Sequence, residues 1–228
     1  MDTILLHHHM GIGDHIALNG LVFTMFDDYY GYESVKLFCK DRYVQMFKEL
    51  YTDPRIELLG VPDCQTIEEE ICQVDIIAKQ FPDAEFVRIG FNDYRPHPNK
   101  TCDQVFYEMV NIPYQNKYTH FRMNRNRQEE DRVFNKLNPT GEDYIFVHDS
   151  PERGWNISVQ TPYNIIRNDP SENLFHYGKI IENAKELHCV ESSFRCLSEH
   201  LDMSAVKLVY HPIRPGVSIT SIHKWEVA

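Results

Sequence analysis

Short apolar runs alternate with segments of helical periodicity along almost the whole chain, and this alternation limits the possible folds more than any other feature. The first run, residues 3–8, leads into Gly11-Ile12-Gly13-Asp14 and then into a helical pattern over residues 14–28, whose apolar side chains share one face. Repeated strand–helix units of this size form parallel sheets covered by helices. The sequence therefore predicts an α/β protein.

The other expected elements continue this order through two halves of the chain. In the first half we expect strands at residues 35–39, 56–61 and 85–89, and helices at residues 41–51, 67–78 and 102–110. In the second half we expect strands at residues 143–148, 163–167, 187–190 and 206–210, and helices at residues 128–137, 173–185 and 192–201. Residues 91–101 and 114–126 are expected to be irregular. The pattern predicts two small Rossmann-like parallel-sheet domains facing a cleft, residues 1–122 and residues 123–228.

Composition places the chain among folded globular proteins and narrows its partners. The 228 residues suffice for one large domain or two small α/β domains, and 42% of them are hydrophobic and 12% aromatic. A formal net charge of -11 argues against nonspecific binding of nucleic acid or of anionic membranes, because both need basic patches. An anionic ligand would have to be bound locally, by backbone amides and a few arginines.

The sequence also predicts a cytoplasmic location. It contains no apolar run of the roughly 18 residues that a membrane-spanning helix needs. Asp2 and the lack of a basic segment before Ile4 do not fit a secretory signal. The cysteines show no Cys-x-x-Cys spacing, so we expect free thiols and neither a zinc site nor a disulfide framework. These cysteines are Cys39, Cys64, Cys72, Cys102, Cys189 and Cys196.

The first candidate site is the turn between the N-terminal strand and its helix. Gly11 and Gly13 would let a ligand approach the backbone closely, and the helix dipole beyond them favours negative charge. Asp14 is either a helix N-cap or a catalytic carboxylate, and the two roles are compatible. The run His7-His8-His9 is not expected to bind a metal, because successive strand residues point to opposite faces. One or two of these histidines are expected to form hydrogen bonds with a ligand.

Two further candidate motifs follow strands in the second half. His148 ends one strand, and Arg153 in the loop after it is suited to a bidentate contact with phosphate, unless it is simply a solvated turn residue. Around residue 190 another strand runs into Glu191, which we expect to accept hydrogen bonds from ribose hydroxyls.

The segment after Glu191 opens a helix. Ser192 is expected to be its N-cap, and the amides of Ser193 and Phe194 point out of the helix start, where a diphosphate can bind. Residues 168–173 follow another strand end, and we favour a capped turn there over a contact with a nucleotide base.

These motifs and the two-half layout resemble the GT-B-fold glycosyltransferases, in particular the ADP-heptose:lipopolysaccharide heptosyltransferase type. The resemblance implies that the N-terminal half binds the acceptor, that the C-terminal half binds the nucleotide, and that Asp14 is the general base. The late motif is Glu191-Ser192-Ser193-Phe194 where heptosyltransferases have Asp-x-Gly-x-x-His. The resemblance therefore implies a nucleotide-sugar donor without implying heptose.

The resemblance then implies a metal-independent glycosyltransferase with no cofactor, which transfers a sugar from a nucleotide-sugar donor to a hydroxyl of a glycan. Asp14 or His15 would deprotonate the acceptor, while Arg153 and the amides near Ser192 and Ser193 would hold the departing diphosphate. The chain has no Asp-x-Asp pair for Mg²⁺ or Mn²⁺. Three alternatives remain: a nucleotide-sugar epimerase or hydrolase, a non-catalytic nucleotide-binding protein, and a metal-dependent hydrolase that uses the histidine run.

Overall fold

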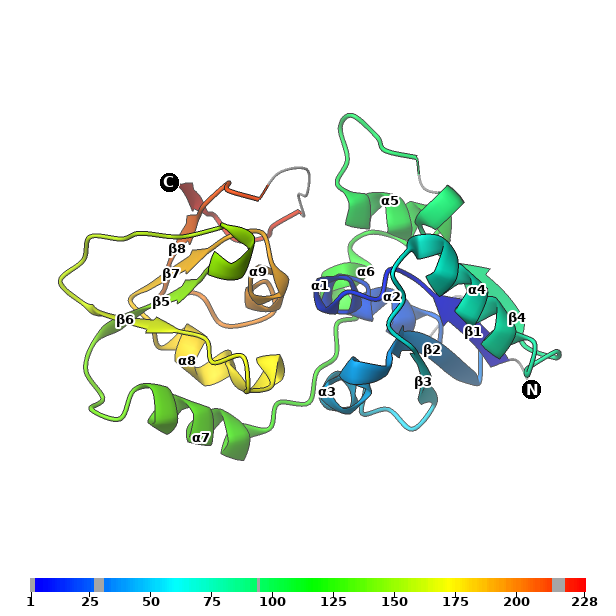
Figure 1. Cartoon of the computed structure of the whole chain (residues 1–228), viewed down its shortest axis with the longest axis horizontal. Helices are drawn as coiled ribbons and strands as arrows, with labels where there is room; N and C mark the ends of the chain where they lie inside the picture. The colour runs from blue at the N-terminus through cyan, green and yellow to red at the C-terminus, as the bar shows by residue number, and fades with distance from the viewer. Residues whose placement is uncertain (1–2, 27–30, 94, 215–219) are drawn as a thin grey trace. The chain divides into compact units, whose positions relative to one another are not determined.

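The structure is a computed structural model that describes residues 3–26, 31–93, 95–214 and 220–228. Its internal contacts divide the chain into two compact units, Met1–Asn124 and Arg125–Ala228. Figure 1 shows the first unit in blue to green and the second in green to red. The sequence had placed the boundary between residues 122 and 123.

The first unit is built on a four-stranded sheet in which all neighbouring strands are parallel. Its strands are β1 (Thr3–His7), β2 (Ser34–Lys40), β3 (Ile56–Val61) and β4 (Glu85–Arg88), in the order β3-β2-β1-β4. All four were predicted. The apolar runs identify them because parallel strands covered on both faces are nearly continuously hydrophobic.

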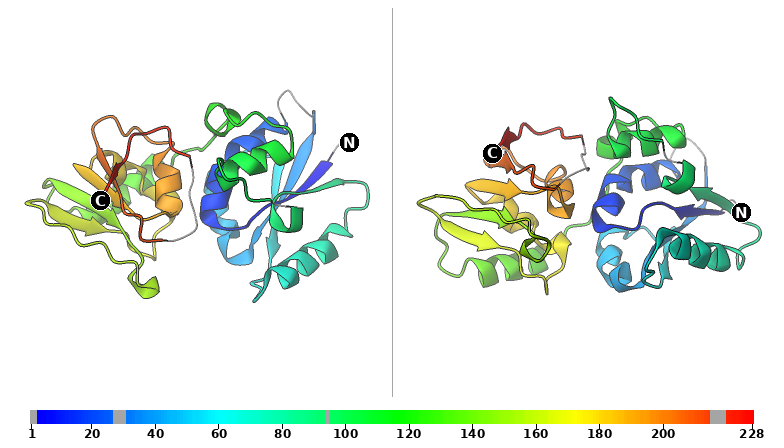
Figure 2. Two further views of the ribbon diagram at one scale, coloured as in Figure 1. Left: turned by 90° about the horizontal axis from the view of Figure 1, so that it is seen from above. Right: turned by 45° about the horizontal axis from the view of Figure 1, so that its top comes forward.

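Helices lie on both sides of this sheet (Figure 2). They are α1 (Ile12–Ala17), α2 (Asn19–Thr24), α3 (Val44–Leu50), α4 (Ile67–Ala78), α5 (Cys102–Met109) and α6 (Asn116–Thr119), with 3₁₀ turns at Asp41–Tyr43 and Phe91–Asp93. On one face Val74 of α4 packs with Leu5, Met10 and Phe38.

The single helix predicted for residues 14–28 is wrong within the described residues. The helix begins at Ile12 and is interrupted at Leu18, where φ is -99° and ψ is 2°. After the interruption α2 packs against α6, and a Cβ at Gly20 would collide with the carbonyl oxygen of Asn116. The break at Leu18 thus goes together with close packing of α2 on a segment about 100 residues later in the chain. Helical periodicity within one segment contains no information about such a contact. Residues 27 and 28 lie outside the described residues.

The second unit is built on a five-stranded parallel sheet. Its strands are β5 (Tyr144–His148), β6 (Asn164–Arg167), β7 (Glu186–Cys189), β8 (Lys207–Tyr210) and β9 (Glu226–Val227), in the order β6-β5-β7-β8-β9. The sequence analysis missed β9. It has only two residues, both exposed, and so it carries no apolar signal.

The helices of the second unit are α7 (Arg127–Leu137), α8 (Gly178–Glu182) and α9 (Ser193–Ser198), with 3₁₀ turns at Pro151–Arg153 and Leu174–His176. The predicted helix over residues 173–185 is therefore two short pieces. At their junction a Cβ on Gly178 would collide with the guanidinium of Arg125, so this part of the chain is also shaped by a distant segment.

The strand orders determine where each unit can bind a ligand. In the first sheet β1 has β2 on one side and β4 on the other, and in the second sheet β5 lies between β6 and β7. Successive connections leave in opposite directions at these points, and parallel α/β sheets bind ligands in the crevice just outside the strand carboxyl ends there. The segments concerned follow β1, β4, β5 and β7, and three of the four hold a predicted site motif.

Two predictions about the whole chain can also be compared with the structure. All six cysteines are free, as expected. In the part of the chain that the structure describes, no helix combines the length and the apolar character needed to cross a membrane.

Candidate active site

Asp14 lies in the first turn of α1 at the carboxyl edge of the first sheet. The helix begins at Ile12 with Gly11 as its N-cap residue, and no side chain caps it. The prediction that Asp14 caps the helix is therefore wrong, because the helix starts two residues earlier than expected. An acidic residue in the first turn is still favoured by the helix dipole.

Gly11 makes room for the carboxylate of Asp14. A Cβ built on Gly11 would lie 2.5 Å from Asp14 Oδ2, well inside contact distance. The φ angle of Gly11 is -71°, which any residue adopts. Glycine is thus not required here by the backbone conformation, and its missing Cβ leaves space for the end of the Asp14 side chain. Asp14 remains partly exposed.

His15 does not lie where it could act on a ligand. Its side chain is fully buried, its ring centroid is 4.0 Å from that of Phe47, and its Nδ1 lies 3.4 Å from the hydroxyl of Tyr51. Burial holds its pKa well below the usual value, so the imidazole is neutral. The prediction of His15 as an alternative base is corrected to a core residue, and Asp14 remains the candidate base.

The run His7-His8-His9 is held by separate partners. His7 is buried and accepts a hydrogen bond from Arg88 Nε at 3.0 Å, while His8 Nδ1 donates to the carbonyl of His9 at 2.7 Å. Burial lowers the pKa of His8 to about 3. Across residues 3–26, 31–93, 95–214 and 220–228, no three His, Cys, Asp or Glu side chains are grouped to hold a metal ion.

The turn after β4 contacts the run His7-His8-His9, a feature that the sequence analysis missed. Gly90 and Phe91 both have left-handed backbone conformations, with φ of 89° and 55°. Positive φ is uncommon for a residue such as phenylalanine, and it places the Phe91 ring 4.4 Å from His7 and 4.7 Å from His9 between centroids. The Phe91 N–H also donates to His9 Nε2 at 3.3 Å. Such strained residues cluster at functional sites.

His148 and Phe194 come together at the carboxyl edge of the second sheet. Their rings are stacked with centroids 4.2 Å apart, although His148 ends β5 and Phe194 belongs to α9. His148 Nδ1 lies 2.8 Å from Asn168 Oδ1. Because an amide oxygen only accepts hydrogen bonds, Nδ1 carries the proton and Nε2 carries a lone pair. Burial lowers the pKa of His148, which favours this neutral form.

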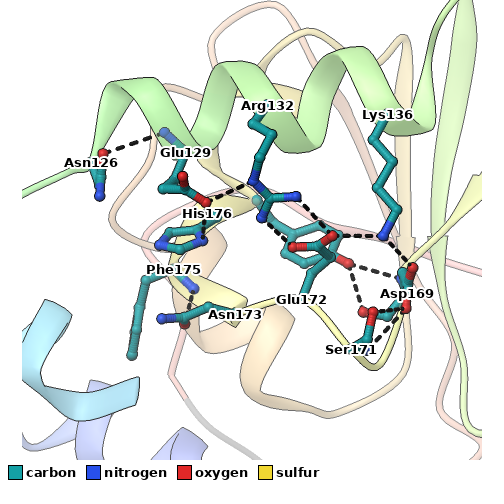
Figure 3. A network of polar contacts seen from close by, with 11 residues as sticks. Asn126, Glu129, Arg132, Lys136, Asp169, Ser171, Glu172, Asn173, Phe175 and His176 are labelled. Carbon is teal, nitrogen blue, oxygen red and sulfur yellow. Dashed lines mark hydrogen bonds and ion pairs between the residues drawn. The ribbon is translucent and has the colours of Figure 1, made fainter. Parts of the chain in front are cut away.

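The loop that carries Asn168 is pinned by an ionic network to α7 (Figure 3). Arg132 donates two hydrogen bonds to Glu172, at 3.0 and 2.5 Å, and Lys136 bridges Glu172 at 2.7 Å and Asp169 at 2.8 Å. The expected capped turn over residues 168–173 is confirmed, since Asn173 caps the following 3₁₀ turn at 3.0 Å. The turn holds Asn168 and, through it, the imidazole of His148.

Ser192 occupies the N-cap position of α9 but does not use its hydroxyl as a cap. Its φ and ψ are extended, and no side-chain capping bond is formed. The Oγ atom is buried and has no hydrogen-bond partner in the described part of the chain. The predicted capping role of the Ser192 side chain is therefore wrong. The amides of Ser193 and Phe194 belong to the first turn, which has no intrahelical acceptors.

Glu191 has a partner that the sequence analysis did not identify. Its carboxylate is buried and forms an ion pair with Arg195, one turn later. The guanidinium of Arg195 lies over the rings of Tyr210 and Trp225, 4.7 and 5.3 Å from their centroids. Glu191 is thus held rigidly in place, and any contact with a ribose would be shared with Arg195.

Arg153 is exposed in the 3₁₀ turn after β5. Its Nε lies 3.9 Å from the exposed carboxylate of Glu152, and its guanidinium lies 5.4 Å from the centroid of Trp155. An antiparallel bridge between Ser150 and Trp155 closes the loop. Arg153 is therefore accessible to a ligand at the edge where sequence analysis placed it.

The two units together define a GT-B-type, heptosyltransferase-like fold. No family model matches the sequence, and no curated protein matches it either. The whole chain superposes on the glycosyl transferase family 9 protein from Veillonella parvula DSM 2008, with a TM-score of 0.60, 10% identity and 87% of that chain covered. It also superposes on the E. coli ADP-heptose lps heptosyltransferase II, with a TM-score of 0.55, 10% identity and 90% of that chain covered. The predicted class of two parallel-sheet α/β domains is confirmed.

Proposed function

We propose that this protein is a glycosyltransferase that moves a sugar from a nucleotide-sugar donor to a hydroxyl of a glycan-type acceptor, without a metal ion. One observation carries the proposal. The switch-point edge of the first unit presents a carboxylate, and that of the second unit presents an accessible arginine beside aromatic rings. The similar folds named above, described as glycosyltransferases, support assigning these two chemistries to one reaction.

In this proposal Asp14 is the general base. Its carboxylate takes the proton of the acceptor hydroxyl while that oxygen bonds to the anomeric carbon of the donor sugar. The bond from the anomeric carbon to the phosphate oxygen breaks, and the nucleoside diphosphate leaves with the electron pair. The nearby thiol of Cys102 is a poor alternative nucleophile, because burial and the carboxylates of Asp103 and Asp14 raise its pKa to about 11.

The second unit would bind the nucleotide and stabilise its departure. Arg153 and the amides of Ser193 and Phe194 would supply positive potential for the diphosphate. Because the net charge of the chain is -11, an anionic ligand has to be bound by such local groups. The buried Ser192 hydroxyl, which has no hydrogen-bond partner in the described residues, stands at the same helix start. His148 would present its Nε2 lone pair to the nucleotide, and Glu191 would share a ribose hydroxyl with Arg195.

Two further parts of the proposal, the absence of a cofactor and the cellular location, rest on the residues that the sequence contains. We propose that no metal or other cofactor takes part, because the chain lacks an Asp-x-Asp pair. We also propose a cytoplasmic location, since six free cysteines are typical of a reducing compartment.

The test begins with a thermal-shift screen of UDP, GDP, ADP, CMP and dTDP, because a ligand that binds the folded state raises its melting temperature. The matching nucleotide sugar is then incubated with and without glycan acceptors, and the released nucleotide is measured. A transferase releases nucleotide only when an acceptor is present. Release without acceptor would identify a hydrolase, and binding without turnover would identify a non-catalytic binding protein. Either result would overturn the proposal.

A further inference from the structure

A second arginine, Arg214, lies beside Arg153 at the carboxyl edge of the second sheet. Arg153 follows β5, and Arg214 follows β8, yet each guanidinium carbon is 5.4 Å from the centroid of the same ring, that of Trp155. The two guanidinium groups are consequently no more than about 11 Å apart, whatever their directions from the ring. The sequence analysis did not identify Arg214 or Trp155.

Little negative charge compensates these two cations. The Nε of Arg153 lies 3.9 Å from the Glu152 carboxylate, and both side chains are more than half exposed, so this pair contributes little. Arg214 donates from Nη1 to the backbone carbonyl of Glu191 at 3.1 Å, and no carboxylate pairs with it among the residues that the structure describes. The carboxylate of Glu191 is taken by Arg195. Two cations on one ring, neither of them paired with a buried carboxylate among the described residues, favour an anionic ligand.

Trp155 is a fixed support for both guanidinium groups. Its ring packs against Ile145, Val147, Ile157 and Val190, which form the core beneath the edge. Its backbone exchanges hydrogen bonds with Ser150 at 2.9 and 3.1 Å. Because core packing and backbone hydrogen bonds hold the ring, the cation–π contacts can position both guanidinium groups in the absence of a ligand.

We infer that Arg153 and Arg214, positioned by Trp155, form a clamp for the two phosphates of a diphosphate. A guanidinium presents a planar fork of donors that matches phosphate oxygens, and two such groups can engage one phosphate each. The contact of Arg214 with the Glu191 carbonyl places it next to Ser192, whose unpartnered hydroxyl is a further donor. The clamp deepens the proposed function by assigning the leaving group to named residues, and its nucleotide identity rests on that function.

The test measures binding of inorganic pyrophosphate and of inorganic phosphate by calorimetry. Arg214→Ala is expected to weaken pyrophosphate binding about 10- to 100-fold and to weaken phosphate binding less, because a single phosphate needs only one arginine. Trp155→Leu should weaken pyrophosphate binding by a similar factor. Trp155→Phe keeps an aromatic ring and should therefore retain most of the wild-type affinity for pyrophosphate. Lys185→Ala is the matched control, because this exposed cation precedes β7 at the opposite edge of the sheet.

Thermal melts of each variant show whether a loss of binding comes from the site or from unfolding. Arg214→Lys keeps the positive charge but lacks the planar guanidinium, so its affinity for pyrophosphate should lie between those of the wild type and Arg214→Ala. Unchanged pyrophosphate affinity in folded Arg214→Ala and Trp155→Leu would overturn the clamp even if sugar transfer is observed. Failure of the wild-type protein to bind pyrophosphate would also overturn it. If the clamp binds pyrophosphate but no nucleotide sugar reacts, the proposed function fails and the clamp stands.

Discussion

The first unit presents an acid and neutral imidazoles at the carboxyl edge of its sheet, whereas the second presents arginines and aromatic rings. In the first, Asp14 is partly exposed while burial lowers the pKa values of His7 and His8. In the second, the guanidinium groups of Arg153 and Arg214 both lie 5.4 Å from the centroid of the Trp155 ring. Under the proposed function, we therefore expect the same type of sheet edge to accept a proton in one unit and to bind an anion in the other.

The two units are also stabilised differently. The first contains a buried ion pair, Lys117 with Asp103 at 2.6 Å, and a close backbone contact between Gly20 and Asn116. The second also contains a buried ion pair, Arg195 with Glu191, and it has in addition the charge network around Glu172 in Figure 3. The first unit should thus be sensitive to changes in side-chain volume, and the second to pH.

The largest expected effect is that of Asp14→Asn. Removing the proton acceptor should lower the rate of sugar transfer by about 10²- to 10⁴-fold and leave nucleoside diphosphate affinity unchanged. Transfer is measured by nucleotide release and affinity by calorimetry. Asp83→Asn, an exposed carboxylate of the same unit, is the control and should behave as wild type. Full activity in Asp14→Asn would remove Asp14 from the mechanism.

Arg153→Ala tests the opposite chemistry in the second unit. Loss of a charge-assisted hydrogen bond should weaken nucleoside diphosphate binding by about 1.5–3 kcal/mol. Calorimetry on the wild type, the variant and Lys185→Ala measures this difference. Equal affinity in all three proteins would exclude Arg153 from the site.

Gly20→Ala tests the sensitivity of the first unit to volume. The new methyl group meets the backbone of Asn116, which cannot move away easily, so the free energy of unfolding should fall by about 1–3 kcal/mol. Gly60→Ala is the matched control, because there the obstruction is only the end of the exposed Asp41 side chain. Urea unfolding followed by circular dichroism compares them. Equal stability of the two variants would contradict the close contact between α2 and α6.

Gly11→Ala sharpens the role of Asp14 without removing its charge. The added methyl group must displace the carboxylate, so transfer should slow by about tenfold while the melting temperature changes little. In an Asp14→Asn background the same substitution should cause no further loss, because the two changes act on one group. Additive losses would show that Gly11 acts independently of Asp14.

The smallest effect is expected for Glu172→Gln. The hydrogen bonds from Arg132 and Lys136 lower the pKa of Glu172 from 4.5 to about 2. A carboxyl group whose pKa is lower in the folded state stabilises the fold above its unfolded pKa, and this contribution is lost as the pH falls from 4.5 towards 2. Melting temperature against pH should therefore fall less steeply in this range for the variant. Glu33→Gln, an exposed residue of the first unit, should keep the wild-type slope.

Local sequence patterns were enough to predict β1 to β8 and the strand ends after which Asp14, Arg153 and Glu191 follow. Buried parallel strands are apolar over several residues, and their carboxyl ends are where α/β sheets bind ligands. The same patterns misled where the chain responds to distant segments. Helical periodicity continued past Leu18 and Tyr177, although the structure interrupts both helices.

The sequence by itself determined the α/β class, the division into two halves and the strand ends at which chemistry is possible. Only the tertiary structure decided which side chains at those ends are available. It buried His15 among aromatic rings, gave Glu191 to Arg195, left the Ser192 hydroxyl without a partner and brought Arg214 to Trp155. Each of these outcomes depends on contacts between residues on different elements, and neither propensity nor periodicity within one segment contains that information.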